Sequence, residues 1–501
     1  MSGPPRVAPR HAARSPRGTV GRALGFSTVN TALSKLASLV IGVALARILG
    51  PDEFGTFAVA LIALMAVLSF NELGVSLAIV RWPGDPARLA PTVTTVAIAS
   101  SLLLAGLTAW AAGPFATAMG DPDAVLPVRL LALCIVVNGV VATPAALLQR
   151  ALRQDQRLVA DQVNLWLGAV VSIALAVAGV GAMSLVVGRL TGALVSAVLL
   201  LRFSPLPFRL GLDRTLVPAL LRFGLPLAAA SLVVFGVGFA DQLAVGGVLG
   251  PTLLGAYVLA FNLASWPVQL LSAPLRQVTP PLFARRQHDP ELVRRTLVGI
   301  SRPLLALAVP CCVALAVCAG PVVRVVYGDA WSAAAEPLRW LALAAVVRIL
   351  AELVYDYLVI VGRTSWLLAV QVVWFAALVP AVVLGTHLGG LAGAALAQLV
   401  VGVVVVGPAY ALALHRARTP AWRLLPGLLL PAGAGVVLLA VVSLPGLRGG
   451  PDLLVLGACG LVTAAAWAVL LGRLRPEVAL LRRGPAPEPV PTTHAPLEAV
   501  R

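Results

Sequence analysis

Charged residues are scarce in this chain. Asp, Glu, Lys and Arg make up 11% of its 501 residues, whereas 59% are hydrophobic; a soluble globular domain carries about 25% charged residues. Apolar runs of roughly 20 residues recur from end to end, and each is long enough to cross a hydrocarbon layer as a helix. The composition excludes a soluble globular protein and predicts an all-α polytopic membrane protein.

Lysine is almost absent, because Lys35 is the only lysine among 37 basic residues. The formal net charge of +17 is of the kind that attracts nucleic acid. Most of the arginines, however, lie in short segments between apolar runs, which is the pattern that sets membrane topology. We therefore expect membrane lipids as partners and no nucleic acid.

The sequence also lacks the elements of catalysis and metal binding. It has no Walker loop, its five histidines lie in tails or loops, and its five cysteines lie in apolar runs without zinc-like spacing. The longest external loop, residues 320–337, is too short to build an extramembrane domain. We predict a protein that is not an enzyme, with no catalytic residue, no metal and no cofactor.

Fourteen apolar runs predict about fourteen transmembrane helices. They cover residues 26–48, 55–79, 89–112, 126–147, 160–179, 182–201, 223–248, 254–275, 298–319, 338–360, 365–385, 389–413, 425–444 and 452–472. With the N-terminus in the cytoplasm, almost all arginine-rich connections fall on the cytoplasmic side. An even number of spans then places both termini of a multi-pass protein on the cytoplasmic side of the cytoplasmic membrane.

One phrase occurs twice, 200 positions apart. LGPDEFGTF at residues 49–57 is repeated as LGPTLLGAY at residues 249–257. The first copy joins spans one and two, and the second joins spans seven and eight. The repeat predicts two parallel six-helix lobes followed by two further helices. Glycine and proline at these places are turn chemistry, so we expect the phrase to have a structural role.

The predicted organisation is a sequence of six segments. They are a disordered basic cytoplasmic tail (1–22), an N-lobe with helices 1–6 (23–202), a cytoplasmic inter-lobe connection (203–222), a C-lobe with helices 7–12 (223–414), helices 13–14 (424–473) and a disordered tail (484–501).

Several segments resemble a known family. GVALARILGPDEFG at residues 42–55, QRALR at 149–153, LRFGLP at 221–226 and ADQLAVGGVLGP at 240–251 are similar to polysaccharide-export flippases of the Wzx/WzxC type. These belong to the multidrug/oligosaccharidyl-lipid/polysaccharide exporter superfamily. The likeness covers roughly residues 20–300. It implies two lobes around a cavity that opens alternately to each side, and an undecaprenyl-pyrophosphate-linked oligosaccharide as cargo.

Ionisable groups inside a bilayer cost about 2.5–3.5 kcal/mol each, so their presence needs a reason. The first span carries a polar stripe whose members share one helical face: Ser27, Thr31, Ser34, Lys35 and Ser38. Lys35 lies about 18 Å into the span at 1.5 Å per residue. It either faces a water-filled cavity that holds a pyrophosphate or reaches back to the cytoplasmic interface.

The tenth span carries Arg348, Glu352 and Asp356 at successive i,i+4 steps. One interpretation is a self-neutralising ladder that faces another helix. The other is that Arg348 contacts the anionic substrate while a carboxylate exchanges protons or sodium. The two interpretations are compatible.

Further polar residues lie in spans two, six and seven: Asn71, Glu72, Arg189, Asp241 and Gln242. Glu72 and Asp241 are candidates for ion coupling, although either could pair with Arg47 or cap a helix, and a structural role is favoured for Asp241. Arg189 is a candidate second substrate cation or a partner for a carboxylate.

The favoured function is translocation of a lipid-linked oligosaccharide for exopolysaccharide, lipopolysaccharide or other cell-surface polysaccharide biosynthesis, with glycosyltransferases or a polymerase as partners. One alternative is a cation-coupled small-molecule antiporter of the multidrug type. A membrane polysaccharide polymerase or ligase is less favoured, because the external loops are short and poor in charge.

Overall fold

The computed structural model describes residues 16–71, 78–79, 85–284, 290–362, 364–419, 421–442 and 450–474. Within these ranges every regular element is helical, which confirms the predicted all-α fold. The long helices are α1 (Pro16–Asn71), α3 (Pro86–Ala118), α4 (Val125–Arg150), α5 (Gln154–Val177), α6 (Met183–Phe203), α7 (Val217–Leu249), α8 (Pro251–Ala284), α9 (Pro290–Val317), α11 (Ala335–Ile360), α12 (Thr364–Val401), α14 (Leu425–Val442) and α15 (Asp452–Arg473).

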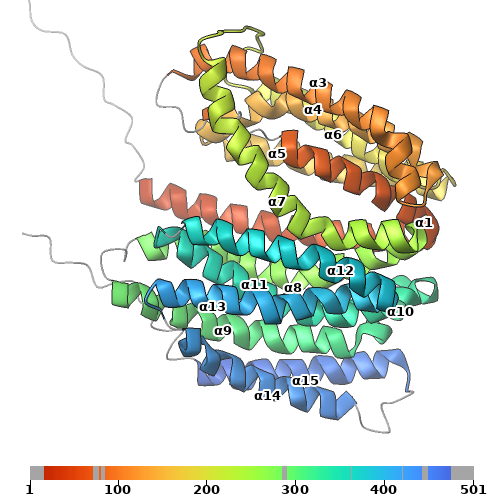
Figure 1. The fold of residues 1–501 in the computed structure, drawn as a ribbon, viewed down its shortest axis with the longest axis vertical. Coiled ribbons are helices and arrows are strands. Elements are labelled where there is room, and N and C mark those ends of the chain that lie inside the picture. The colour runs from red at the N-terminus through yellow and green to blue at the C-terminus, as the bar shows by residue number, and fades with distance from the viewer. Residues whose placement is uncertain are drawn as a thin grey trace, which may run out of the picture. The chain divides into compact units, whose positions relative to one another are not determined.

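Shorter elements connect these helices (Figure 1). They are η1 (Pro122–Ala124), α10 (Ala319–Tyr327), η2 (Asp329–Ala334), a π-helical turn η3 (Gly402–Val406), α13 (Gly407–Arg416) and η4 (Ala421–Leu424). Two of the long helices contain a break in their helical geometry. The backbone of α1 leaves helical geometry at Gly50, and that of α12 does so at Gly389 and Gly390. Each break separates two predicted spans.

The described helices match the predicted number of spans. Ten helical stretches are long and apolar enough to cross a membrane, and two of these, Ala37–Ser69 and Trp366–Arg416, each overlap two predicted spans. The predicted spans outside the ten lie in α11, which carries Arg348, Glu352 and Asp356, and in the shorter apolar helix α14. About fourteen transmembrane helices are therefore accounted for.

The chain divides into two compact units. The first consists of Met1–Trp266, Ala319–Leu341 and Ala369–Val405, and the second of Pro267–Cys318, Ala342–Leu368 and Val406–Arg501. Several helices pass from one unit into the other, so the units do not follow the predicted lobes. The lobe boundaries at 23–202 and 223–414 stay predictions.

In the first unit, α3, α4, α5 and α6 pack side by side (Figure 1). Small residues bring α5 and α6 together: a Cβ on Gly188 would lie 2.0 Å from the Ser172 hydroxyl oxygen, and one on Gly192 would lie 2.5 Å from the Asn164 carbonyl oxygen. Lipid tails are as apolar as leucine, so close backbone contact, rather than water exclusion, holds membrane helices together. Glycine at these positions is what permits that contact.

In the second unit, α9 packs against both α14 and α15. The indole N–H of Trp467 on α15 donates to the backbone carbonyl of Leu307 on α9 over 3.1 Å. A Cβ on Gly435 of α14 would lie 3.3 Å from the Val313 side chain. Helices α14 and α15 are thus packed against α9.

The predicted connection 203–222 lies along the start of α3. Gly211 donates its backbone N–H to the Thr95 hydroxyl over 3.0 Å and accepts from the same hydroxyl over 2.8 Å. Asp213 donates its backbone N–H to Thr92 Oγ1 over 3.1 Å. The hydroxyl and backbone N–H of Thr215 hold the pKa of the exposed Asp213 carboxyl below its ordinary value. The connection is therefore a fixed strap rather than a loose linker.

Candidate functional site

The two copies of the repeated phrase contact each other. Gly50 and Gly250 both adopt positive φ angles, 74° and 84°, in the left-handed region that glycine occupies without strain. A Cβ on Gly55 would lie 2.1 Å from the Pro251 carbonyl oxygen, and one on Gly255 would lie 2.7 Å from the Pro51 carbonyl oxygen. The two turns are packed backbone to backbone in a reciprocal arrangement, which only glycine allows.

A polar contact joins the same two turns. The hydroxyl of Thr252 donates a short hydrogen bond to the Asp52 carboxylate, and these residues hold the same place in the two copies of the phrase. The structural role that the sequence predicts for the phrase thus has a specific form. We refer to residues 50–55 and 250–255 together as the paired turns.

Two side chains tie α1 to the elements that precede α11. Arg47 donates to the carbonyl oxygens of Val325 and Val326, the latter over 2.7 Å, and these belong to the last turn of α10. The positive charge of Arg47 at the C-terminal end of α10 complements the dipole of that helix. The buried indole of Trp331 donates to the Ala46 carbonyl oxygen over 3.1 Å and meets the Phe54 ring edge to face at 5.5 Å.

Glu53 adds a third connection beside the paired turns. Its carboxylate accepts from the backbone N–H of Ala182 over 2.7 Å, at the N-terminus of α6. A carboxylate is stabilised there by the N–H groups that the first helical turn leaves without partners. The paired turns, Arg47, Trp331 and Glu53 together join α1 to α6, α8, α10 and η2 at one end of the first unit, and we call this set of contacts the closure. Sequence reasoning missed Trp331 and Glu53, because their partners are distant backbone atoms.

Asp241 lies at the centre of a buried polar cluster in the first unit. It is fully buried, and its carboxylate accepts from the equally buried Tyr257 hydroxyl over 2.9 Å and from the Gln398 side-chain amide over 2.5 Å. The three side chains come from α7, α8 and α12. The cluster ties three helices together around one carboxylate, and it lies close to the second copy of the phrase.

The predicted ladder on α11 forms in part. Arg348 Nε lies 3.7 Å from Glu352 Oε1, and the two side chains are 45% and 22% exposed. Asp356 follows one turn later and is half-buried. Tyr410 of α13 lies near both carboxylates. The intrahelical pairing is therefore present, and the substrate and ion-coupling roles of this face stay predictions.

The remaining candidates are less fully described. Arg189 of α6 has an exposed side chain and lies near Cys134 of α4, and Ser38 of α1 is also exposed. Thr31, Ser34, Lys35 and Asn71 lie in α1, and only their backbone is described. Glu72 lies outside the described residues. Among the residues that the structure describes, no group of His, Cys, Asp and Glu could hold a metal ion.

Comparison with known proteins places this arrangement in a family. The sequence model of the family described as "Polysaccharide biosynthesis protein" matches residues 44–336, more than half of the chain. The chain belongs to this family. Both copies of the repeated phrase, Arg47 and Asp241 fall inside the matched region.

Relatives within the polysaccharide biosynthesis family cover most of the chain. The succinoglycan biosynthesis transport protein ExoT of Rhizobium meliloti is 28% identical over 392 residues, 77% of this chain and 78% of ExoT. The lipopolysaccharide biosynthesis protein WzxC of Escherichia coli is 23% identical over 427 residues, 82% of this chain and 87% of WzxC. The resemblance stated from the sequence is confirmed, and so is the predicted class of transporter rather than enzyme.

Solved structures show the same fold at low sequence identity. The lipid II flippase MurJ in an inward closed conformation superposes with a TM-score of 0.74, covering 89% of this chain and 99% of MurJ at 14% identity. An inward-facing multidrug transporter of the MATE family gives a TM-score of 0.60, covering 77% of this chain and 96% of that one at 17% identity. This family member therefore has the fold shared by lipid flippases and multidrug transporters.

Proposed function

We propose that the protein moves a lipid-linked oligosaccharide from the inner to the outer leaflet of the cytoplasmic membrane by alternating access. The observation that carries the proposal is the closure of one end of the first unit by the paired turns, reinforced by Arg47 and Trp331. These contacts are few, reciprocal and local, and a transporter of this kind must break such a closure in each cycle. The transport relatives and the flippase fold support the same function.

The cargo we propose is an undecaprenyl-pyrophosphate-linked oligosaccharide of a surface-polysaccharide pathway. Lys35, Arg189 and Arg348 supply the in-membrane cations for its pyrophosphate, while the sugar crosses in a hydrated interior and the lipid tail stays in the bilayer. Arginine and lysine form strong charge-assisted hydrogen bonds with phosphate, and ionisable residues within spans mark substrate pathways. Glycosyltransferases or a polymerase would supply the cargo and receive it.

Proton or sodium coupling is part of the proposal. Asp241 is the strongest of the four candidate carboxylates, because it is fully buried and held by Tyr257 and Gln398. Glu352 and Asp356 of α11 are the second choice, and Glu72 is the third. A carboxylate that binds a proton or a cation in one conformation only would link the ion gradient to opening.

The arginine distribution sets the proposed orientation. Both termini lie in the cytoplasm, and the paired turns, which follow spans one and seven, then face the outside. The end of the first unit that the paired turns close is the external end in this arrangement. The protein would release cargo to the outer leaflet when these contacts part.

The test of the proposal is a matched set of arginine and lysine variants. Lys35→Ala and Arg348→Ala should each abolish translocation of the lipid-linked oligosaccharide while membrane insertion and abundance stay at wild-type levels. The control is Arg339→Ala, on the same helix as Arg348, because the Arg339 side chain is half-exposed and lies 3.7 Å from the Glu336 carboxylate. Wild-type translocation by both the Lys35 and Arg348 variants would refute the assignment.

A cation-coupled small-molecule antiporter is the second candidate. One observation favours it: Glu352 and Asp356 lie near Tyr410, and carboxylates beside aromatic rings suit an organic cation. The two functions differ in their cargo. Ion-driven efflux of an organic cation by the purified protein, without movement of a lipid-linked oligosaccharide, would establish the second.

A further inference from the structure

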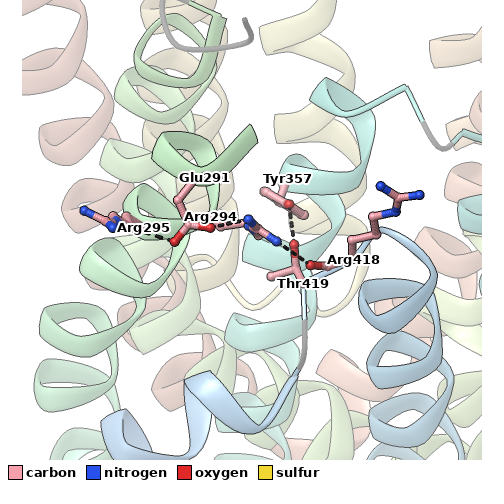
Figure 2. Close-up of polar contacts among 6 residues, drawn as sticks. All are labelled: Glu291, Arg294, Arg295, Tyr357, Arg418 and Thr419. Carbon is pink, nitrogen blue, oxygen red and sulfur yellow. Dashed lines mark hydrogen bonds and ion pairs between the residues drawn. The ribbon is translucent and has the colours of Figure 1, made fainter. Parts of the chain in front are cut away.

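Three helix ends of the second unit meet at a polar network (Figure 2). Arg294, near the start of α9, donates to the Glu291 carboxylate and, over 2.8 Å, to the backbone carbonyl of Arg418 beyond α13. The Tyr357 hydroxyl near the end of α11 is bonded to the buried Thr419 hydroxyl at 2.7 Å. Since α9 begins here and α11 and α13 end here, the network marks one face of the unit.

Arg418 has an unusual backbone for its residue type. Its φ is 58°, in the left-handed region where glycine is the usual residue and an L side chain is strained. The turn is a helix C-cap, in which the Arg418 N–H donates to the His415 carbonyl and the Thr419 N–H donates to the Leu414 carbonyl. Glycine would make the same turn without strain. The turn alone does not explain an arginine at this position.

The Arg418 side chain is available for a ligand. It is exposed and points away from Arg294 in Figure 2, while the Arg418 carbonyl oxygen faces Arg294. Its guanidinium has no bonded partner among the residues that the structure describes. A strained backbone that displays an unengaged charge is a reason to look for function at this site.

Two more exposed arginines lie at these helix ends. Arg416 is exposed, and its guanidinium lies over the Trp366 ring at 5.4 Å, which holds it in place without neutralising it. The Arg295 side chain is 75% exposed. Glu291 is the nearby carboxylate, and it is shared between Arg294 and Arg295. We call Arg416 and Arg418 the arginine surface; Arg295, whose side chain points away from Arg418 in Figure 2, adds positive charge at the same helix ends.

The surroundings indicate which anion the arginine surface meets. The three helices that end here are apolar spans or lie next to them, and Trp422, four residues beyond Arg418, is 63% exposed. Exposed tryptophan beside the end of a membrane helix is typical of the headgroup layer. Arginine binds phosphate oxygens in a bidentate manner, and clusters of basic residues next to spans bind anionic lipids.

We propose that the arginine surface binds the phosphate of an anionic phospholipid headgroup at the end of α9, α11 and α13. Arg416 and Arg418, two residues apart at the end of α13, supply the main contacts, and Arg295 supplies additional charge. The bound lipid stabilises the junction that Arg294, Tyr357 and Thr419 form. This site is separate from the in-membrane cations proposed for the cargo and does not depend on the identity of that cargo.

The decisive variant is Arg418→Gly, because it removes the guanidinium while it relieves the backbone. The purified full-length protein is titrated with phosphatidylglycerol or phosphatidylcholine, and thermal stability and bound lipid are measured. Arg418→Gly should melt at or above the wild-type temperature in phosphatidylcholine and bind phosphatidylglycerol about fivefold more weakly, the loss typical of one arginine at an anionic membrane. Arg295→Gln should weaken phosphatidylglycerol binding in the same direction.

The matched control is Leu152→Gly. Leu152 is the other described non-glycine residue with positive φ, at 56°, and it is 82% exposed. This variant relieves the same kind of strain and should leave phosphatidylglycerol binding unchanged.

Three results would overturn the proposal. The first is wild-type phosphatidylglycerol binding by Arg418→Gly, which would mean that the arginines only set topology. The second is equal stabilisation by inorganic phosphate at matched concentration, which would identify a soluble anion as the ligand. The third is binding of an acidic protein, but not of phosphatidylglycerol, to the arginine surface.

Discussion

Gly55→Ala should break the closure formed by the paired turns. The added Cβ would lie 2.1 Å from the Pro251 carbonyl oxygen, whereas a carbon–oxygen contact needs about 3.3 Å. The two backbones must therefore separate by about 1 Å, and no flexible side chain can move aside to avoid this. Overpacking of this kind costs about 1–3 kcal/mol. Because the cost falls on the closed conformation alone, the equilibrium should shift about 5- to 150-fold towards opening.

The shift can be measured by the distance between spin labels at positions 48 and 248. Both residues are exposed and directly precede the paired turns, so a label there does not intrude on the contact. The native protein should give mainly the short distance, and Gly55→Ala should give a larger fraction of long distances. Gly42→Ala is the control, because it lies on the same helix with no heavy atom within 4 Å of its Cβ position. A distance distribution for Gly55→Ala that equals that of the native protein would refute the reasoning.

Three further predictions concern polar groups of the first unit. Gln398→Leu should destabilise the protein by about 1–3 kcal/mol in a thermal melt, because it removes a donor to the buried Asp241 carboxylate. The control is Gln371→Leu, which removes a half-buried amide on the same helix and should have little effect. Arg47→Ala should weaken the closure by about 1 kcal/mol, and Arg47→Lys should restore only part of this in the spin-label assay, because an ammonium cannot span both carbonyls as the guanidinium does. The Asp213 pKa is depressed in the folded protein, so its bond to Thr215 stabilises the protein above the ordinary pKa of about 3.9, and this stability is lost as the pH falls through the lower folded value. Thr215→Val should therefore lower the melting temperature slightly at neutral pH and leave it unchanged below the folded pKa, so that this part of the acid-side fall disappears.

The fold was largely predictable from local signals. Apolar runs located the helices, and glycine followed by proline located both repeated turns, because span length and turn chemistry depend on neighbouring residues. The break at Gly50 falls between two predicted spans, and the break at Gly389–Gly390 falls at the predicted start of the span 389–413. The division into two compact units was not predicted, since it depends on which helices pack together.

The site was predictable only as a set of separate residues. Asp241 was visible as a polar group within a span, but its partner Gln398 lies 157 positions away, and the pairing depends on helix packing. Arg47 was considered as a partner for Glu72 or Asp241, and yet it donates to backbone carbonyls 278 and 279 positions away. Backbone atoms are the same at every residue, so no sequence pattern marks them as partners.

The paired turns show most clearly that the sequence marks single residues but not their partners. The repeated phrase predicted two similar turns, and the glycines predicted close packing at each. That Gly55 packs on Pro251 and Gly255 on Pro51 requires the two copies to face each other. The closure on which the proposed transport cycle depends is therefore a property of the folded chain.

The central claim, movement of a lipid-linked oligosaccharide, is tested most directly in proteoliposomes that contain only this protein. A labelled oligosaccharide on a polyprenyl pyrophosphate is placed in both leaflets, and the fraction open to an external sugar-modifying enzyme is followed over time. The native protein should make the inner-leaflet pool accessible, and the double variant Lys35→Ala/Arg348→Ala should leave it protected. Equal protection of that pool with the native protein and with empty vesicles, under both proton and sodium gradients, would contradict the proposed function.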